Sequence, residues 1–285
     1  MSGTQTWFIT GTSSGFGRAF AEHALAQGHR VVATARRVES LAALVAQAPE
    51  HVLAVALDVD VPGAAEAAVA AAVSRFGRID VLVNNAGYGV VGALEETPDV
   101  ELRAIFDTNF FGAMAVTRAV LPVLREQRGG AIVNVSSLGG QLSFAGFGAY
   151  SATKFALEGA SEALAQEMAP FGVKVLIVEP GQFRTNLAGA GMRHMPPMPA
   201  YDDVVGGTRE FAHDMHQTQA GDPRKAAVAI ERALSAERTP LRLQLGGDAV
   251  DAVRAHAQAL LADMDAWEAV SRATDLDVAD PAVAR

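Results

Sequence analysis

Short apolar segments alternate with longer stretches of helical pattern along most of this chain. Most apolar segments are rich in Val, Ile and Leu without strict alternation, which is typical of strands covered on both faces. The predicted strands are 6–10, 30–34, 52–57, 79–83, 131–135, 173–178 and 241–245. Ala-rich stretches between them, such as 16–27, 63–76 and 101–126, are predicted helices. This order predicts an α/β fold with a doubly wound, parallel, seven-stranded sheet and helices on both faces.

The character of the chain changes after residue 185. Residues 186–220 are rich in Gly, Pro and Met, and we interpret them as a mobile insertion that forms a substrate loop. Residues 246–285 are predicted to be a C-terminal helical extension, with a helix over 248–270 and a loose tail after Ser271. No linker or internal repeat divides the chain, so residues 1–285 are interpreted as a single domain.

Composition excludes several classes of function. The 285 residues carry a net charge of −9, and the Lys and Arg residues form no basic run, so nucleic acid is not an expected partner. The absence of cysteine excludes disulfides, thiolate zinc sites and thiol catalysis. The chain shows neither a signal-peptide pattern nor an apolar run of membrane-spanning length. We therefore expect a cytoplasmic protein with no membrane partner.

A glycine-rich turn, ITGTSSGFGRAF, joins the first predicted strand to the first predicted helix. Gly11 suits the tight turn, Gly15 lets the backbone approach a pyrophosphate, and Gly17 lets the helix pack close to the sheet. The helix N-terminus adds unpaired N–H groups and the positive end of the helix dipole. The turn therefore predicts a dinucleotide site, in which the glycines are accompanied by Ser13, Ser14 and Phe16.

The stretch GAYSATKFAL places Tyr150 one helical turn before Lys154, on the same helix face. Alone, such a pair is ordinarily a helix surface contact. Ser137, in IVNVSS, lies thirteen residues before Tyr150, at the end of a predicted strand. Ser136 and Ser137 could both cap that strand end, but the spacing favours Ser137 as a catalytic residue.

Taken together, the glycine turn, NNAG (84–87), DTNFFG (107–112), the serine, tyrosine and lysine, and EPGQFRT (179–185) resemble the short-chain dehydrogenase/reductase family. The resemblance covers roughly residues 5–245. Residues 136–157 further resemble the 17β-hydroxysteroid dehydrogenase-like and retinol dehydrogenase-like branches. The resemblance implies a Rossmann fold, a nicotinamide cofactor and an oxidoreductase that forms homodimers or homotetramers.

Hydride transfer to a ketone leaves an alkoxide that must gain a proton. Tyr150 is the predicted general acid in reduction and general base in oxidation. Because a free tyrosine has a pKa of about 10, we expect the Lys154 ammonium and the oxidised cofactor to lower the pKa of Tyr150. Lys154 would also hold the cofactor ribose, and Ser137 would bind the substrate oxygen. The resemblance further implies that Asn109 anchors a water that links Lys154 to solvent.

The end of the second predicted strand, VVATARR, indicates the cofactor. NAD sites place a carboxylate near this position to bind the ribose 2′-hydroxyl, but here Ala35 stands there and Arg36 follows. A carboxylate would repel a 2′-phosphate, whereas an arginine binds it with charge-assisted hydrogen bonds. We therefore predict NADP(H), read mainly by Arg36 with Arg37 or Ser13 as helpers.

The resemblance implies further cofactor contacts along the sheet edge. Asp58 and Val59 would meet the adenine, whereas Asp60 is interpreted as a helix cap before Pro62. The adenosine-ribose side would be lined by Asn85, Ala86 and Gly87. The nicotinamide side would be lined by Pro180, Gly181, Phe183 and Thr185.

Three functions remain open. The leading hypothesis is an NADPH-dependent carbonyl reductase or alcohol dehydrogenase acting on an apolar ketone or secondary alcohol. An epimerase or dehydratase of related fold ranks lower, because such chains are usually longer and have a different glycine spacing. A nicotinamide-binding sensor is the alternative outside the enzymes. His213 and His216 are interpreted as surface residues, so no metal is expected.

Overall fold

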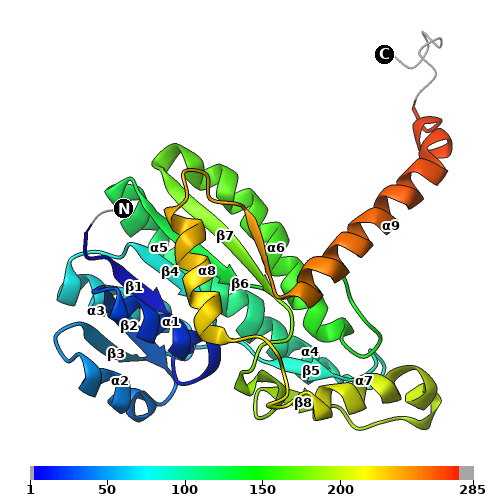
Figure 1. Cartoon of the computed structure of the whole chain (residues 1–285), viewed down its shortest axis with the longest axis horizontal. Helices are drawn as coiled ribbons and strands as arrows, with labels where there is room; N and C mark the ends of the chain where they lie inside the picture. The colour runs from blue at the N-terminus through cyan, green and yellow to red at the C-terminus, as the bar shows by residue number, and fades with distance from the viewer. Residues whose placement is uncertain (1–2, 276–285) are drawn as a thin grey trace.

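A computed structural model of the chain describes residues 3–275. Seven parallel strands form the central sheet in the order β3-β2-β1-β4-β6-β7-β9 (Figure 1). Their bounds are β1 Thr6–Ile9, β2 Arg30–Ala35, β3 Val52–Ala56, β4 Val81–Asn84, β6 Gly130–Val135, β7 Val173–Pro180 and β9 Arg242–Leu245. The predicted seven-stranded parallel sheet is confirmed.

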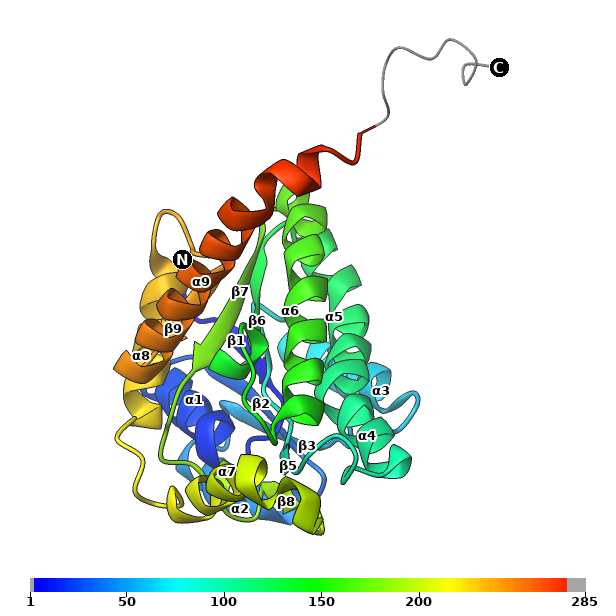
Figure 2. The ribbon, with the colours of Figure 1, turned by 90° about the vertical axis from the view of Figure 1, so that its right-hand side faces the viewer.

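Helices cover both faces of the sheet, and Figure 2 shows the two layers on either side of it. Helices α1 (Gly15–Ala26), α2 (Ala42–Gln47) and α8 (Pro223–Ser235) pack on one face. Helices α3 (Ala64–Phe76), α5 (Ala113–Gln127) and α6 (Gly148–Met168) pack on the other. Because strand side chains alternate between faces, Trp7 and Ile9 enter the first core and Phe8 enters the second. Because helices cover both faces of one parallel sheet, the predicted doubly wound arrangement is confirmed.

The strand order reverses at β1, and this reversal creates a crevice at one edge of the sheet. The chain runs from β1 outward to β3 and then crosses to β4 on the other side of β1. The loops after β1 and β4 therefore diverge and leave a crevice at the carboxyl edge of the sheet. Thr10 joins the two loops, since its Oγ1 accepts hydrogen bonds of 2.9 Å from both the Asn85 and Ala86 backbone N–H groups.

The single helix predicted over 101–126 is interrupted. Helix α4 (Asp99–Phe106) is followed by a π-helical turn over Asp107–Gly112 before α5 begins. Such a turn inserts an extra residue and often occurs at functional sites. Asn109 lies in this turn and is buried. The helical periodicity of the sequence does not reveal the interruption, because residues on both sides keep an apolar face.

The substrate loop, residues 186–220, contains regular elements that its composition conceals. Strand β8 (Met192–His194) pairs in parallel with β5 (Gly89–Val91), which follows NNAG, and helix α7 (Asp202–Asp214) comes next. Both strands have only three residues, too short for a periodic pattern. The buried Glu96 carboxylate then clamps the loop: it accepts hydrogen bonds from the Met198 N–H at 2.7 Å and from the Arg209 guanidinium.

Removal of the Glu96 charge should release the substrate loop. In Glu96→Gln the half-buried Arg209 keeps its charge without a carboxylate partner, which is unfavourable. We expect trypsin cleavage within the loop, at Arg193 or Arg209, to accelerate about tenfold, since each 1.4 kcal/mol of eased opening gives that factor. Glu95→Gln is the matched control, because Glu95 holds the same loop through a solvent-exposed bond to Tyr201. Equal cleavage rates in the two variants would contradict this role of Glu96.

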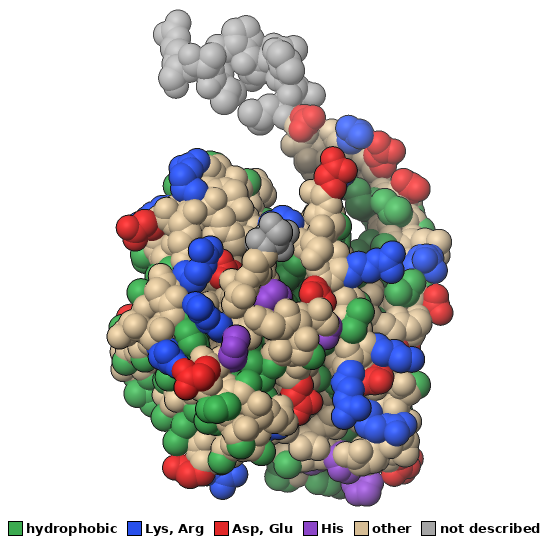
Figure 3. Space-filling model, turned by 60° about the vertical axis from the view of Figure 1, so that its left-hand side comes forward, with side chains coloured by type: hydrophobic (Ala, Val, Ile, Leu, Met, Phe, Trp, Pro, Cys, Tyr) green, Lys and Arg blue, Asp and Glu red, His purple; other side chains and the backbone are tan. Residues whose placement is uncertain are grey.

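Helix α9 (Gly247–Arg272) projects from the body beyond the sheet (Figure 1). Among its residues only Ala249 is buried. Apolar side chains are exposed on its outer half (Figure 3): Leu260, Leu261, Met264, Trp267 and Val270. The predicted C-terminal extension thus holds a long helix, while the part over 276–285 lies outside the described residues. Across residues 3–275, the helices fall short of the length and apolarity that crossing a bilayer requires.

Candidate active site

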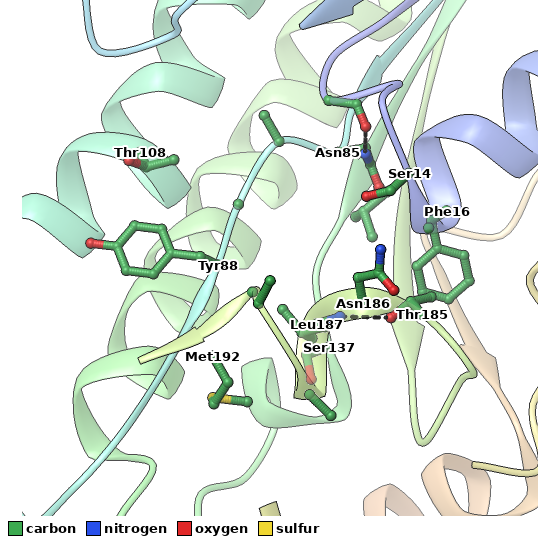
Figure 4. Close-up of a pocket in the computed structure, with 18 of the residues that line it drawn as sticks. Ser14, Phe16, Asn85, Tyr88, Thr108, Ser137, Thr185, Asn186, Leu187 and Met192 are labelled. Carbon is green, nitrogen blue, oxygen red and sulfur yellow. Dashed lines mark hydrogen bonds between the residues drawn. The ribbon is translucent and has the colours of Figure 1, made fainter. Parts of the chain in front are cut away.

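A cavity of about 510 Å³ opens at the carboxyl edge of the sheet. Figure 4 shows side chains from the glycine turn, from the loop after β4 and from the substrate loop facing one space. Of the residues predicted for the site, all line this cavity except Gly17, Asn109 and the predicted helper Arg37. The fold thus brings together motifs that lie up to 174 positions apart, from Gly11 to Thr185.

The glycine turn presents an open helix end to the cavity. Ser14 stands at the N-cap of α1 but makes no side-chain capping bond, and the first helical turn contains no acidic residue. Ser13, Ser14, Gly15 and Phe16 line the cavity at this point. By contrast, Asp222 caps α8 through the Arg224 N–H. The first N–H groups of α1 are therefore available to a phosphate, so these residues fit a dinucleotide.

Gly17 does not line the cavity but packs against the glycine turn and Asn85, in agreement with its predicted packing role. A Cβ built on Gly17 would lie 2.6 Å from Asn85 Nδ2 and closer still to the Gly11 carbonyl oxygen. Asn85 Nδ2 donates to the carbonyls of Thr10 (2.9 Å) and Gly11 (3.1 Å). The Asn85 side chain therefore fastens the glycine turn to the loop after β4, and its neighbours Ala86 and Gly87 line the cavity.

The residues predicted to meet the adenosine, Arg36, Asp58 and Val59, line one part of the cavity. Arg36 is exposed, and within residues 3–275 no hydrogen bond or ion pair engages its guanidinium. The interpretation of Asp60 as a helix cap is wrong: Gly63 is the N-cap of α3, and Asp60 Oδ2 accepts a 2.8 Å hydrogen bond from Thr108 Oγ1. Burial raises the pKa of Asp60, which lies at the cavity wall.

Helix α6 and the end of β6 meet at the proposed catalytic residues. Tyr150 and Lys154 lie one turn apart, and Lys154 Nζ is 5.8 Å from the centre of the Tyr150 ring. Lys154 Nζ donates a 2.9 Å hydrogen bond to the Val135 carbonyl. Ser137 Oγ accepts from the Gly139 N–H at 3.0 Å. Burial lowers the pKa of Lys154 to about 8.

The sequence predicts that Lys154 lowers the pKa of Tyr150, but the protein groups around Tyr150, taken without a cofactor, raise it. Burial raises the pKa of Tyr150, and a hydrogen bond with Ser137 opposes this only in part. The phenol therefore keeps its proton at neutral pH. Desolvation of the site outweighs an ammonium that is itself buried and that bonds to a backbone carbonyl.

Asn109 fixes the loop after β4 from behind. Its Oδ1 accepts from the Tyr88 N–H at 3.0 Å, and its Nδ2 donates to the Tyr88 carbonyl at 2.9 Å and to Thr153 Oγ1 at 3.2 Å. A Cβ on Gly87 would lie 2.9 Å from Asn109 Oδ1 and 3.9 Å from Lys154 Nζ. The Asn109 side chain thus shapes the backbone beside Lys154, while its predicted part in a water relay stays a prediction.

The residues predicted for the nicotinamide side follow β7 and border the glycine turn. The Phe183 ring packs on the Phe16 ring at 5.1 Å between centroids. A Cβ on Gly15 would lie 3.3 Å from Thr185 Cβ, a tight contact, and the positive φ of Gly15, 57°, itself favours glycine there. Thr185 Oγ1 caps the following turn through the Leu187 N–H. Pro180, the last residue of β7, and Gly181 also line the cavity.

Several cavity residues escape the sequence motifs. Tyr88 directly follows NNAG, and that position is the only local signal for it. Arg193 of β8 lies 4.1 Å over the Tyr88 ring and pairs with Glu101 at 2.9 Å. Burial and the Glu101 carboxylate raise the pKa of Tyr88 to about 12, so Tyr88 does not compete with Tyr150 as a proton donor. Gln219 also lines the cavity, and its Oε1 has no hydrogen-bond partner among the described residues.

The methionines of the substrate loop divide between two roles. Met192 and Met215 line the cavity and give this part of its wall an apolar surface. Met195 is buried in a small core with Val90 and Ile105 instead. Over residues 3–275, no group of three or more acidic or histidine side chains is placed to hold a metal ion.

Known proteins resemble this chain closely in sequence. Residues 5–195 match the short chain dehydrogenase family. The oxidoreductase BOA17 of Botryotinia fuckeliana is 40% identical over 272 residues, which are 95% of this chain and 99% of that protein. A 3-ketodihydrosphingosine reductase of Bacteroides thetaiotaomicron is 36% identical over 251 residues, which are 85% of this chain and 88% of that protein.

Solved structures resemble it equally well. A short-chain dehydrogenase from Streptomyces avermitilis superposes with a TM-score of 0.91 at 54% identity, over 96% of this chain and 100% of that one. A short chain dehydrogenase/reductase from Burkholderia phymatum in complex with NAD has a TM-score of 0.78 at 26% identity, over 88% and 92% of the two chains. The predicted 17β-hydroxysteroid dehydrogenase-like or retinol dehydrogenase-like branch stays a prediction. The chain therefore belongs to the short-chain dehydrogenase/reductase family of oxidoreductases.

Proposed function

We propose that this protein is an NADP(H)-dependent oxidoreductase that transfers hydride between the nicotinamide and an apolar ketone or secondary alcohol. One observation carries the proposal: Ser137, Tyr150 and Lys154 line the same cavity as the open N-terminus of α1. The phosphate end and the proton-donating end of a hydride-transfer site are thus joined in one space.

The residues of the site divide the work of reduction. NADPH, when bound, supplies the hydride. Ser137 orients the carbonyl oxygen of the substrate, and Tyr150 donates its proton to that oxygen as negative charge develops. The raised pKa of Tyr150 suits this direction, because the phenol is protonated at neutral pH. Lys154 holds the cofactor ribose and stabilises the phenolate that remains after transfer.

Apolar side chains at the cavity support an apolar substrate. Leu187, Met192 and Met215 of the substrate loop line it. Methionine adapts to irregular apolar groups. The relative from Bacteroides thetaiotaomicron, named as a reductase of 3-ketodihydrosphingosine, is consistent with a ketone on a long apolar chain.

A turnover screen tests the proposed function. Purified protein is incubated with NADPH and a panel of ketones of increasing chain length, and NADPH oxidation is followed at 340 nm. We expect turnover that favours apolar ketones. The sensor alternative predicts NADPH binding without turnover of any ketone, and the epimerase or dehydratase alternative predicts product without net NADPH oxidation.

Replacement of Arg36 tests the choice of cofactor. In Arg36→Ala the 2′-phosphate loses a charge-assisted bond, so we expect the Kd for NADPH to rise about tenfold or more while the Kd for NADH stays within about twofold. Cofactor fluorescence titration measures both. Arg37→Ala tests the predicted helper, and Arg238→Ala, which is exposed and absent from the cavity lining, is the matched control. Equal weakening of both cofactors by Arg36→Ala would contradict NADP(H) selectivity.

Assembly into a homodimer or homotetramer is part of the same proposal. The exposed apolar side chains of α9 support it, because solvent-exposed stripes of this kind commonly mark contacts between proteins. Sedimentation of the full-length chain distinguishes monomer, dimer and tetramer.

A further inference from the structure

Three successive side chains of α6 face the end of β6. Tyr150, Lys154 and Glu158 are spaced by one helical turn each, so they form a row on one helix face. Lys154 and Glu158 are both buried. The sequence pattern gives no reason to expect a carboxylate at this depth, and neither the motifs nor the proposed mechanism uses Glu158.

Each member of the row engages one residue of the strand end. Lys154 Nζ donates to the Val135 carbonyl at 2.9 Å. Ser136 Oγ donates to Glu158 Oε1 at 2.6 Å. Ser137 hydrogen-bonds with the Tyr150 phenol. Residues 135–137 thus each bond to a side chain from a different turn of α6, and Glu158 holds Ser136, the middle residue of the three.

The other Glu158 oxygen is held by the surrounding elements. Glu158 Oε2 accepts from the Gln141 side chain and from Arg242 Nε at 3.1 Å. A Cβ on Gly140 would collide with Glu158 Oε1, so glycine at 140 makes room for the carboxylate. Both oxygens therefore have partners in fixed directions, which leaves the Glu158 side chain one position.

The charged groups around Glu158 are unbalanced. Lys154 and Glu162 lie on the same helix, Glu179 projects from β7, and Arg242 from β9. Arg242 pairs with Glu158, Glu162 and Glu179, so one guanidinium serves three carboxylates. Burial and the Glu158 carboxylate raise the pKa of Glu179 to about 7. A proton on Glu179 would relieve this excess of negative charge and leave the Glu158 charge to Lys154 and Arg242.

Building on the proposed function, we propose that Glu158 is a positioning residue of the active site. Its hydrogen bond to Ser136 holds the strand end that presents Ser137. Its charge, four residues from Lys154, favours the protonated lysine against the cost of burial. Glu179 and Arg242 fix the carboxylate in place. Glu158 touches neither substrate nor cofactor in this role.

Lysine titration tests the electrostatic part without any substrate. The chain has only three lysines, Lys154, Lys174 and Lys225, so protein labelled with ¹³C at the lysine ε-carbon gives three NMR signals. Lys174→Arg and Lys225→Arg assign them. In Glu158→Gln we expect the Lys154 midpoint to move to lower pH than in the wild type, whereas Glu162→Gln leaves it in place. Glu162 is the matched control, because it lies on the same helix and pairs with the same arginine.

Turnover tests the positioning part. At pH 7 we expect Glu158→Gln to lower kcat about tenfold and to leave the KM of the ketone within about twofold of the wild type. A tenfold change corresponds to the loss of one hydrogen bond to a charged group. Ser136→Ala should lower kcat similarly without moving the Lys154 midpoint, and Glu162→Gln should change neither. Glu158→Asp, which keeps the charge, should restore the Lys154 midpoint.

The outcomes separate this inference from the proposed function. A folded Glu158→Gln protein whose Lys154 titrates as in the wild type overturns the electrostatic role, and an unaltered kcat in Ser136→Ala overturns the positioning role. Should Glu158→Gln fail to fold, the Lys154 midpoint in Glu158→Asp and kcat in Ser136→Ala decide instead. A wild type that reduces no ketone defeats the proposed function alone, because the lysine titration requires no turnover.

Discussion

Tyr150→Phe should lower kcat for ketone reduction about 10³-fold while NADPH still binds within about twofold of the wild-type Kd. The substitution removes only the hydroxyl and keeps the ring that packs against Phe147. Without the phenol, the reduced carbonyl oxygen has no positioned proton donor, because Tyr88 is held by Glu101 and its pKa is raised to about 12. Stopped-flow reduction and fluorescence titration measure the two quantities separately.

Tyr201→Phe is the matched control for this prediction. Tyr201 carries an identical hydroxyl, bonded at 2.5 Å to Glu95 on the surface, and does not line the cavity. We expect its kcat to equal that of the wild type. A Tyr150→Phe enzyme with wild-type kcat would show that another group protonates the product, and the assignment of Tyr150 would then fail.

Gly17→Ala should abolish high-affinity NADPH binding although Gly17 does not line the cavity. The added Cβ would lie 2.6 Å from Asn85 Nδ2 and closer to the Gly11 carbonyl oxygen, so α1 or the glycine turn must shift. Overpacking of this kind costs about 1–3 kcal/mol. We expect a Kd for NADPH at least about tenfold higher and a Tm about 5 °C lower.

Gly207→Ala should have the opposite effect on stability. Gly207 also lies inside a helix, α7, but it is exposed and a Cβ there would meet no atom within 4 Å. Replacement of a helical glycine by alanine stabilises by roughly 0.5–1 kcal/mol. Thermal unfolding of the two variants beside the wild type measures the contrast. A Gly17→Ala protein that binds NADPH normally would show that the helix can move away without disturbing the turn.

The features that the sequence predicted well are those that repeat or that lie close together in the chain. Most strands of the main sheet are short apolar runs. The glycine turn, NNAG and the Tyr150–Lys154 pair are patterns that each lie within one short stretch of sequence. Their lining of one cavity follows from the parallel sheet, which brings the carboxyl ends of its strands to one edge. The comparisons confirm the family that these motifs resemble.

The features that the sequence did not predict depend on distant partners. Glu158 appears in ALEGA as an ordinary helix charge, and only Ser136, Gln141 and Arg242 show that it is buried. The clamp of Glu96 on Arg209 joins residues 113 positions apart. The raised pKa of Tyr150 likewise depends on the amount of protein around it, which no spacing records.

The residues proposed for the reaction and the strand of the substrate loop belong to different sheets. Ser137, Tyr150, Lys154 and the glycine turn are built on the seven-stranded sheet and α6. By contrast, β8 pairs with β5 through three residue pairs, and α7 is held by the Glu96 clamp. Under the proposed function, the substrate loop can therefore change in sequence while Ser137, Tyr150 and Lys154 keep their positions. Substitutions confined to residues 186–220, about one eighth of the chain, would then alter substrate selectivity on an unchanged catalytic scaffold.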